Sequence, residues 1–307
     1  MQLITEAQVR ATLTLDAAVQ ALRQAFLQQG QGLASVLARG RAAATLDGRA
    51  LMVSAMGAVL PEVLGTKVYS TLNGQFQFVI TLFCSKTGAP LATLEANELT
   101  RLRTAAATAV AAEALALPES KTLAIFGAGT QARAHAQALL PLRKFERVLV
   151  CARSGAGEFA AELAATHGLP AQAVDAQTAA SQAEVIATCT RATEPLFDGA
   201  WVKPGSFVAA VGSSKPVARE LDDALLARAA LIAVEWKPAA EGEAGEFKRA
   251  AAGVIDPARV AELGALLAAP RPRGERDIVV YKSVGIGLED VAIAHWIYRR
   301  LQGGAAA

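Results

Sequence analysis

The spacing of hydrophobic and polar residues divides the chain near residue 118 into two parts with different patterns. In the first part, two helices are predicted to open the chain, and the second runs from about Thr14 or Asp16 to Gly30 with apolar residues at helical spacing. A long alanine-rich helix is predicted over residues 99–117. Strand-like segments lie between them, at residues 39–45, 49–56, 64–72, 75–84 and 90–94.

Two dipeptides connect neighbouring strands of this first part. Asp47-Gly48 follows residues 39–45, and Asn73-Gly74 lies between residues 64–72 and 75–84. Asp-Gly and Asn-Gly favour two-residue turns in which both residues have positive φ. Each dipeptide therefore predicts a β-hairpin.

From residue 121 the pattern alternates strand and helix, as a doubly wound parallel sheet requires. A final amphipathic helix is expected at residues 289–301, and residues 303–307 are expected to fray. The predicted strands are residues 122–126, 147–151, 185–190, 206–211, 231–234 and 278–280. The predicted fold class is therefore α/β.

The turn after the first of these strands has the spacing of a dinucleotide-binding fingerprint. Gly127 is positioned for a tight turn, Gly129 for close approach of the backbone to a pyrophosphate, and Ala132 for close packing of helix against sheet. Thr130 and Gln131 begin the helix, whose free N–H groups and partial positive charge favour phosphate. These five residues are predicted to bind a dinucleotide.

The residues after the second strand of this part bear on the choice of dinucleotide. An NAD site has Asp or Glu about 20 residues beyond the glycines, where it binds the ribose hydroxyls. Here the strand leads into Ala152, Arg153 and Ser154, without a carboxylate. A guanidinium and a hydroxyl suit a 2′-phosphate, so NADP(H) is the predicted cofactor and NAD the alternative. The other interpretation of Arg153 is a solvated surface residue.

Composition argues against several classes of protein. The 307 residues, 53% hydrophobic and 19% charged, suit two domains with a large interior. A net charge of +2 is too small to indicate a nucleic acid or an anionic membrane as partner. Cys84, Cys151 and Cys189 lie far apart in apolar segments, which predicts buried thiols in a reducing compartment and neither a disulfide framework nor a metal site.

A cytoplasmic location without a membrane partner is expected. Glu6 and Arg10 lie where a signal peptide would have an apolar core. No uncharged apolar run reaches the roughly 18 residues of a membrane-spanning helix.

Three basic residues lie within or beside apolar runs of the first part: Arg41, Lys67 and Arg103. A charge in a half-buried strand is costly unless it is paired or binds an anion. Each residue taken alone could point to solvent or to a distant carboxylate. Together with a nicotinamide site, the three predict a cationic pocket for a small carboxylate substrate.

Several stretches of the chain resemble the ornithine cyclodeaminase/mu-crystallin family, from about Arg41 to Ala294. They read Met-Gly-Ala at 56–58, Leu-Gly-Thr-Lys at 64–67, Asn-Glu-Leu-Thr-Arg-Leu-Arg-Thr-Ala-Ala at 97–106, Gly-Ala-Gly-Thr-Gln-Ala-Arg-Ala-His at 127–135 and Lys-Ser-Val-Gly-Ile-Gly-Leu-Glu-Asp at 282–290. The resemblance implies a Rossmann domain at 119–286, inserted into an α+β substrate-binding and dimerisation domain made of 1–118 and 287–307. It also implies a homodimer built through the sheet of that domain.

The resemblance also implies roles for individual residues. It implies that Arg41 and Arg103 clamp the substrate carboxylate and that Lys67 lies near the carboxylate and the amine or imine. Met56 matches the pattern of the substrate site. His135 follows the fingerprint at the family's spacing, where it either touches the cofactor or packs within its helix. Further cofactor-binding positions are implied at Thr188, Thr190, Val211 and Val284.

The chain departs from the family pattern at three positions. Ornithine cyclodeaminases have an aspartate where this chain has Ser214, and a glutamate where it has Ser54. Gly57 replaces the usual proline after Met56. A serine cannot attract a substrate ammonium as a carboxylate does, nor act as a general base. Ser214 is therefore predicted to line the substrate site without cyclodeaminase chemistry.

These observations together predict an NADPH-dependent reductase of small imino acids, similar to the ketimine reductases of the mu-crystallin branch. The expected substrates are cyclic ketimines such as 1-pyrroline-2-carboxylate and 1-piperideine-2-carboxylate, reduced to L-proline and L-pipecolate. Lys67, Arg41 and Arg103 are the expected catalytic residues. The alternatives are an ornithine cyclodeaminase, an amino-acid oxidoreductase resembling alanine dehydrogenase, and a small-ligand binding protein of the crystallin type that retains NADPH.

Overall fold

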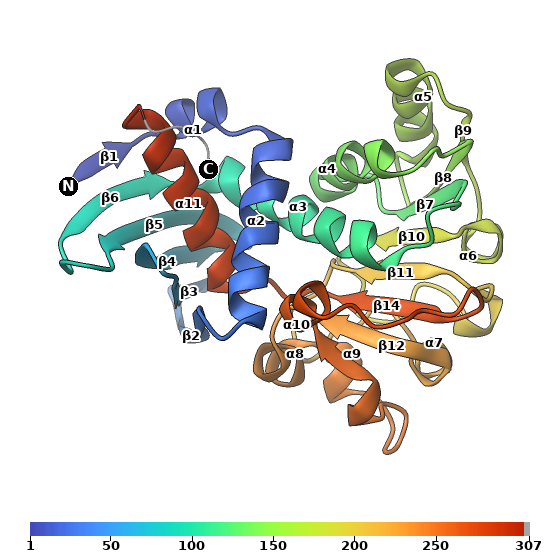
Figure 1. Cartoon of the computed structure of the whole chain (residues 1–307). Helices are drawn as coiled ribbons and strands as arrows, with labels where there is room; N and C mark the ends of the chain where they lie inside the picture. The colour runs from blue at the N-terminus through green and yellow to red at the C-terminus, as the bar shows by residue number, and fades with distance from the viewer. Residues whose placement is uncertain (304–307) are drawn as a thin grey trace. The chain divides into compact units, whose positions relative to one another are not determined.

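The computed structural model describes residues 1–303, and the last four residues of the segment expected to fray lie outside the described part. The described chain forms two compact units (Figure 1). Unit 1 consists of Met1–Ala107 together with the segment that begins at Gly285, and unit 2 is Thr108–Val284. The fold class is α/β, as predicted. The functional domain limits expected at residues 118 and 287 stay predictions.

Unit 1 contains a six-stranded sheet in the order β1-β6-β5-β4-β3-β2. Its strands are β1 (Gln2–Ile4), β2 (Ser35–Leu46), β3 (Arg49–Val59), β4 (Val63–Leu72), β5 (Gln75–Cys84) and β6 (Pro90–Glu95). Neighbouring strands are antiparallel, except that β1 and β6 are parallel. The sequence does not predict β1, because three residues are too few to show an alternating pattern.

Both predicted hairpins are present. The turn residues Asp47 and Gly48 have φ of 51° and 73°, and Asn73 and Gly74 have φ of 49° and 79°. Positive φ at both central positions is the geometry that Asp-Gly and Asn-Gly favour. The turns set the register in which β2 pairs with β3 and β4 pairs with β5.

Helices cover one face of this sheet. They are α1 (Glu6–Thr12), α2 (Leu15–Gly30), the first part of α3 (Asn97–Leu115) and α11 (Gly287–Leu301). α11 packs across β2 to β5, and α2 packs against α11 (Figure 1). We call the sheet face under α11 the inner face and the opposite one the outer face. Met56, Lys67 and Ile80 are buried on the inner face, and the residues that alternate with them belong to the outer face.

Unit 2 is built on an eight-stranded sheet in the order β13-β12-β14-β11-β10-β7-β8-β9. Its strands are β7 (Thr122–Phe126), β8 (Arg147–Cys151), β9 (Ala171–Ala173), β10 (Val185–Thr188), β11 (Phe207–Ala210), β12 (Ala229–Val234), β13 (Val260–Glu262) and β14 (Ile278–Lys282). Every neighbouring pair is parallel, which confirms the predicted doubly wound sheet. The three-residue strands β9 and β13 are absent from the prediction.

The helices of unit 2 connect these strands. They are α4 (Thr130–Leu139), α5 (Ala156–His167), α6 (Ala176–Gln182), α7 (Asp223–Arg228), α8 (Lys237–Glu243), α9 (Gly245–Lys248) and α10 (Leu263–Ala268), with 3₁₀ helices η1 (Leu140–Leu142), η2 (Gly199–Trp201) and η3 (Pro257–Arg259). The strand order reverses at β7, since β8 lies on one side of it and β10 on the other. Doubly wound sheets bind ligands at the carboxyl ends of strands next to such a reversal. The predicted fingerprint follows β7 at this place.

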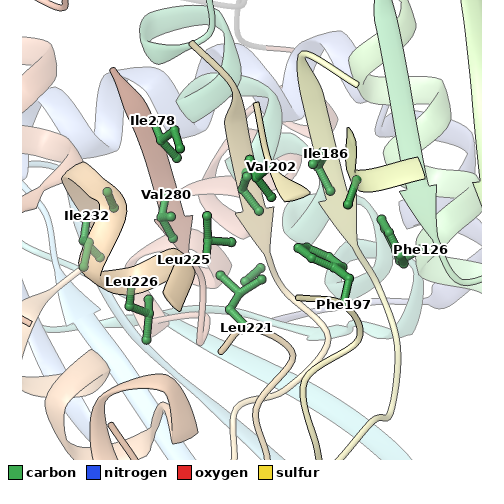
Figure 2. Close-up of a cluster of buried hydrophobic side chains, with 14 of the residues drawn as sticks. Phe126, Ile186, Phe197, Val202, Leu221, Leu225, Leu226, Ile232, Ile278 and Val280 are labelled. Atoms are coloured by element: carbon green, nitrogen blue, oxygen red, sulfur yellow. The ribbon is translucent and has the colours of Figure 1, made fainter. Parts of the chain in front are cut away.

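Apolar side chains of these strands and their connections form a core that includes Ile186, Leu225 and Val280 (Figure 2). Phe126 and Phe197 pack in it with ring centres 4.8 Å apart. Full burial of a side chain of this size contributes about 1.5–3 kcal/mol to folding. The core thereby holds β7, β10 and β11 in the register that positions their carboxyl ends.

Candidate active site in two parts

An ionic cluster lies on the inner face of the unit 1 sheet. Lys67 belongs to β4, Arg103 to α3, and Glu289 and Asp290 to the first turn of α11. Lys67 Nζ lies 2.8 Å from Asp290 Oδ1, and Arg103 Nη1 lies 2.8 Å from Glu289 Oε2. Arg103 Nε is 3.6 Å from Asp290 Oδ1, so this carboxylate connects the two cations. The structure thus brings two of the three predicted cations together, and all four side chains are buried.

Burial changes the protonation of Lys67. Its pKa falls from 10.5 to about 8, chiefly because the ammonium is removed from water, while the charge of Asp290 opposes the shift. The ammonium donates to Thr100 Oγ1 at 2.7 Å and lies 4.3 Å from the centre of the Phe78 ring. Lys67 can therefore exchange a proton closer to neutral pH than an exposed lysine can.

Arg39 is a further cation of this region that the sequence analysis does not predict. Its Nε donates to Met56 Sδ at 3.2 Å, and its Nη2 donates to the carbonyl oxygen of Gly285 at 2.7 Å. Its charge also lowers the pKa of Lys67. The sequence feature that could have predicted Arg39 is its spacing from Arg41, because residues two apart on a strand share a face.

Arg41 is exposed on β2, where its Cα partner on β3 is Ser54. Ser54 and Met56 are buried, and Met56 is the Cα partner of Lys67. Ser54 Oγ is buried without a hydrogen-bond partner among the described residues. The structure therefore sets Met56 beside Lys67 and Ser54 beside Arg41, and the carboxylate-binding role of Arg41 stays a prediction.

The glycine that replaces the family's proline, Gly57, lies where a side chain has no room. A Cβ at Gly57 would lie 2.4 Å from the carbonyl oxygen of Gly65. A Cβ at Gly287, the first residue of α11, would lie 2.4 Å from the backbone nitrogen of Gly57. Close packing of α11 on β3 is the physical reason for both glycines, and it brings the α11 carboxylates to the inner face.

The sequence assigns no role to the carboxylates of α11. Glu289 Oε1 accepts a hydrogen bond from the backbone N–H of Ile286 at 3.1 Å, which caps the helix. Asp290 Oδ2 is buried without a hydrogen-bond partner among residues 1–303. The helix N-terminus stabilises both negative charges. Acidic residues in a first helical turn are common, so their pairing with distant cations is visible only in the fold.

The fingerprint in unit 2 forms a tight turn and an open helix N-terminus. Gly127 has φ of 115°, and a Cβ there would lie 2.8 Å from the carbonyl oxygen of Cys189. Gly129 precedes α4 without a side-chain cap, and apart from its chain neighbours no heavy atom of residues 1–303 lies within 4 Å of where its Cβ would be. Residues 130–132 form the first turn of α4. Open space above a helix N-terminus fits the pyrophosphate of a dinucleotide.

A buried carboxylate, Glu220, joins the strand ends at which cofactor contacts are predicted. Thr188 Oγ1, at the end of β10, donates to Glu220 Oε2 at 2.7 Å. The N–H and hydroxyl of Thr190 donate to Oε1 at 2.8 and 2.6 Å, and the N–H of Gly212 donates to Oε2 at 2.7 Å. Val211 lies between these segments. Hydrogen bonds to a carboxylate are stronger than neutral ones, so Glu220 fixes the carboxyl ends of β10 and β11.

A second buried carboxylate, Glu235, fixes the end of β14. It accepts hydrogen bonds from the Tyr281 hydroxyl, the Ser283 hydroxyl and the backbone N–H of Val284. Ser214 is half-buried in the loop that follows β11. The contacts expected of Val284 with the cofactor and of Ser214 with the substrate stay predictions.

Arg153 and Ser154 are exposed directly after β8. Next to them, Gly155 has φ of 70° and precedes α5 without a side-chain cap. Asp175 lies near the end of β8, since its charge raises the pKa of Cys151 after the larger effect of burial. This carboxylate already caps α6. An exposed guanidinium and hydroxyl beside an open helix N-terminus fit a phosphate group.

His135 is packed inside unit 2. Its Nδ1 lies 2.8 Å from the carbonyl oxygen of Gln131, to which it donates, so its Nε2 accepts from the Thr108 hydroxyl at 3.0 Å. Burial lowers its pKa to about 4. These are the contacts of a neutral, packed helical histidine, the second of the two alternatives that the sequence leaves open.

The cysteines are free thiols, and each is partly exposed where the sequence predicts burial. Cys84 and Cys151 end β5 and β8, and Cys189 follows β10, so their side chains reach the ends of the sheets. The described residues contain no group of three or more His, Cys, Asp or Glu side chains that could hold a metal ion. No helix within residues 1–303 is long and apolar enough to cross a membrane.

A model of the ornithine cyclodeaminase/mu-crystallin family matches residues 1–305. The chain belongs to this family. The predicted resemblance is therefore confirmed. Ketimine reductase mu-crystallin of Mus musculus is 36% identical over 246 residues, which are 77% of this chain and 76% of that protein. A Delta(1)-pyrroline-2-carboxylate reductase of Bacillus cereus is 35% identical over 257 residues, 78% of each chain.

Solved structures of family members match the chain along its length. A probable ornithine cyclodeaminase from Bordetella pertussis Tohama I has a TM-score of 0.93 at 44% identity, covering 100% of both chains. The Delta(1)-pyrroline-2-carboxylate reductase of Thermococcus litoralis, in complex with NADH and L-proline, has a TM-score of 0.88 at 29% identity, covering 100% of this chain and 99% of that one. The iminosuccinate reductase of Paracoccus denitrificans, in complex with NAD+, has a TM-score of 0.91 at 29% identity, covering 99% and 97%. An archaeal alanine dehydrogenase dimer with bound NAD has a TM-score of 0.88 at 26% identity, covering 100% and 98%.

Proposed function

We propose that this protein is an NAD(P)H-dependent reductase of C=N bonds in small imino acids, including cyclic ketimines such as 1-pyrroline-2-carboxylate and 1-piperideine-2-carboxylate. The observation that carries the proposal is the buried cluster of Lys67, Arg103 and Asp290, which offers an anion site and an exchangeable proton in one place. Relatives named as reductases of ketimines and of Delta(1)-pyrroline-2-carboxylate support it.

The cations of the cluster are proposed to bind the substrate carboxylate. Arg103 has a planar fork that matches a carboxylate, and Glu289 holds that fork in place. Lys67, on β4, contributes a second positive charge. The β2 arginines, Arg39 and Arg41, complete the positive surroundings. Holding the carboxylate on several donors removes rotational freedom before the reaction.

Reduction of an imine adds a hydride to the carbon and a proton to the nitrogen. With a pKa of about 8, Lys67 is mostly protonated at neutral pH and can keep the imine nitrogen protonated, which makes the carbon electrophilic. Asp290 Oδ1 orients Lys67, and the unpartnered Oδ2 can accept a hydrogen bond from the protonated nitrogen. These two roles, one for each carboxylate oxygen, explain why Asp290 is buried although its Oδ2 has no hydrogen-bond partner among the described residues.

Unit 2 is proposed to hold the cofactor. The nicotinamide supplies the hydride when it is bound. The fingerprint glycines and the α4 N-terminus fit the pyrophosphate, and Arg153 with Ser154 fits the 2′-phosphate of NADP. Thr188, Thr190, Val211 and Val284 are the remaining proposed contacts. NADPH is proposed as the preferred cofactor; NAD(H) is the alternative, since three similar structures contain NADH or NAD.

The direct experiment incubates the purified protein with NADPH or NADH and a panel of cyclic and linear imino acids, and follows oxidation of the cofactor by absorbance. We expect oxidation that depends on the imino acid and stereospecific formation of the L-amino acid. NADPH that binds tightly but is not oxidised with any imine would contradict the reductase and favour a ligand-binding protein.

Ornithine cyclodeaminase is the second candidate, because the Bordetella pertussis relative carries that name as a probable activity. Ser54 and Ser214 provide no carboxylate for the second ammonium of ornithine. We therefore expect no measurable ammonia from L-ornithine with added NAD. Rapid conversion of ornithine to proline and ammonia would replace the reductase assignment, and oxidation of L-alanine as the main activity would favour an alanine dehydrogenase.

We also propose that the protein is a homodimer formed through the outer face of the unit 1 sheet. Val53, Val59, Val68 and Val79 on this face are 48, 51, 42 and 41% exposed. Val68 is the Cα partner of Val79, and contiguous exposed apolar surface marks an interface. Val68→Asp should convert a dimer to a monomer in sedimentation experiments, whereas Val217→Asp, in a 73% exposed loop position of unit 2, should not. A wild-type monomer would contradict this.

A further inference from the structure

Lys282, the first residue of the Lys-Ser-Val-Gly stretch, is a buried cation at the end of β14. β14 lies between β11 and β12 in the unit 2 sheet (Figure 1), and the Cα partners of Lys282 are Ala210 and Val234 at the carboxyl ends of these strands. The lysine is 1% exposed. Its Nζ lies 3.1 Å from Oε2 of Glu246, which is fully buried. The ion pair of Lys282 and Glu246 is therefore removed from water.

This ion pair binds both ends of one loop. We call residues 213–220, which follow β11, the β11 loop. Lys282 Nζ donates to the carbonyl oxygen of Ser213, the first residue of the loop, at 2.8 Å. Glu246 Oε1 accepts from the backbone N–H of Glu220, the last residue of the loop, at 2.9 Å. One pair of opposite charges thus holds the start and the end of the β11 loop together.

The β11 loop is also held across its middle. The hydroxyl of Ser213 donates to the carbonyl oxygen of Ala218 at 3.0 Å. The start of α9 packs against the same residue, because a Cβ at Gly245 would collide with the carbonyl oxygen of Ala218. Ser214 directly follows the residue whose carbonyl Lys282 binds. The position of Ser214 therefore depends on the contacts of Ser213.

Stability alone does not account for the ion pair. Removing two charges from water is costly, and apolar side chains of similar volume are often equally stable or more stable in the same place. Apolar side chains, however, cannot donate to the carbonyl of Ser213 or accept from the N–H of Glu220. The gain from burying Lys282 and Glu246 is therefore a defined conformation of the β11 loop.

Residues in and next to the β11 loop are predicted ligand contacts. Val211 comes just before the loop and is proposed to contact the cofactor, and Ser214 within the loop is predicted to contact the substrate. The carboxylate of Glu220, at the end of the loop, accepts from the hydroxyls of Thr188 and Thr190. A displacement of about 1 Å in groups that orient reactants can slow a reaction about a hundredfold. The conformation of the β11 loop therefore bears on the rate of reduction.

We propose that Lys282 and Glu246 are positioning residues, which hold the β11 loop in the conformation that the reduction requires. This inference rests on the proposed function. The reaction itself is unchanged, since the carbon receives the hydride and the nitrogen the proton. The ion pair is required for the rate of hydride transfer and not for the affinity for NADPH, whose phosphates are assigned to the fingerprint and to Arg153.

The decisive variant replaces both charges at once. Lys282→Met alone leaves the Glu246 carboxylate buried without its cation and should lower the melting temperature by about 5 °C or more. The double variant Lys282→Met/Glu246→Leu has neither charge and should melt within about 3 °C of the wild type. Its kcat with 1-pyrroline-2-carboxylate should still fall about tenfold or more, while the dissociation constant of NADPH stays within about twofold. A wild-type kcat in the stable double variant overturns the positioning role.

Amide hydrogen exchange reports on the β11 loop without turnover. Peptides that cover residues 212–220 should exchange at least about tenfold faster in the double variant, and peptides that cover α4 should exchange as in the wild type. Unchanged exchange in residues 212–220 overturns the inference that the ion pair holds the loop. No oxidation of NADPH or NADH by the wild type with any imino acid overturns the reductase assignment instead, because the exchange measurement needs no substrate.

The matched control is Lys203→Met. Lys203 pairs with Glu184 at the opposite edge of the same sheet, where the two residues precede β11 and β10. This variant should change neither kcat nor exchange in the β11 loop. A loss of kcat equal to that of the double variant would show a general effect of stability and overturn the positioning role.

Ser213→Ala keeps the proposal testable if the double variant does not fold. It removes the bond across the loop to Ala218 and keeps the ion pair. Exchange in residues 212–220 should rise and kcat should fall about threefold, the same changes as in the double variant but smaller. Wild-type kcat together with faster exchange in Ser213→Ala would separate the loop from the reaction and overturn the proposal.

Discussion

The two units prepare their proposed ligand sites in opposite ways. In unit 1 the site consists of charged side chains that are already paired, Lys67 with Asp290 and Arg103 with Glu289. In unit 2 the fingerprint region offers an open helix N-terminus, and the buried carboxylate of Glu220 holds backbone and hydroxyl groups of its own unit. The first arrangement suits a charged substrate and exchange of a proton, whereas the second suits a phosphate bound by backbone N–H groups.

The difference follows from the cost of burying charge. A buried ion costs several kcal/mol unless a partner and further hydrogen bonds compensate it, so the cations of unit 1 are buried together with the carboxylates of α11. Helix N-termini bind phosphate through N–H groups that need no such partner. Removing a charge from the unit 1 cluster should therefore leave its partner uncompensated, whereas substitutions at the fingerprint should act through shape.

Arg103→Lys should have the largest effect. Lysine keeps the charge but loses the planar fork that reaches Glu289 and the substrate carboxylate, so kcat/KM should fall on the order of a hundredfold. The dissociation constant of NADPH, measured by fluorescence titration, should change less than about twofold because the cofactor is assigned to unit 2.

Arg101→Lys is the matched control for this variant. Arg101 is two residues earlier on α3 and pairs with Glu98 outside the cluster, so imino-acid reduction should be preserved. Wild-type kcat/KM in Arg103→Lys would show that the carboxylate clamp is misassigned.

Two glycine variants separate binding from folding in unit 2. Gly129→Val fills open space and should leave the melting temperature nearly unchanged while weakening NADPH binding about thirtyfold, a steric cost of about 2 kcal/mol at the pyrophosphate. Gly127→Ala places a Cβ 2.8 Å from the Cys189 carbonyl at a φ of 115°, and should lower the melting temperature instead. Unchanged NADPH affinity in Gly129→Val would contradict the pyrophosphate assignment.

The pH dependence of kcat/KM should report Lys67, because this parameter follows ionisation of the free enzyme. A pKa of about 8 means that the ammonium is present below pH 8 and is lost above it. In the reductive direction, kcat/KM should be level below this pKa and fall about tenfold per pH unit above it. In Lys67→Arg the guanidinium stays charged over this pH range, so the residual kcat/KM of the variant should not fall above pH 8. A fall that persists in the variant comes from ionisation of the substrate.

The same contrast explains which parts of the protein could be predicted from sequence. The fingerprint at 127–132 and the two hairpin turns depend on neighbouring residues, and their local chemistry is sufficient. Lys67 and Arg103 were visible because they interrupt apolar runs. Asp290 was not, because an acidic residue in the first turn of an amphipathic helix is ordinary, and its partner is 223 residues away.

Arg39 and the short strands were missed for related reasons. Arg39 is the first residue of the segment predicted as a strand, whereas β2 begins at Ser35, and an irregular register between Leu37 and Gly40 obscures the alternation. β1, β9 and β13 have three residues each and depend on pairing with a neighbouring strand. Hydrogen bonds to a neighbouring strand stabilise these segments, and a local sequence pattern does not show such pairing.

Cofactor preference is the smallest expected effect, and it depends on Arg153, the charged side chain of unit 2 that we propose binds the cofactor. Arg153 is exposed after β8, so its contact with a 2′-phosphate is partly screened by water and should be worth about 1.4 kcal/mol, a tenfold preference for NADPH over NADH. Raising the salt concentration should reduce this preference. Arg153→Asp should narrow or reverse it while leaving the melting temperature unchanged, because no described contact of the fold depends on Arg153. Equal dissociation constants for NADPH and NADH in the wild type would mean that Arg153 does not contribute to cofactor binding. Unit 2 would then bind the dinucleotide without a charged side chain, whereas the proposed site in unit 1 is built from charged side chains.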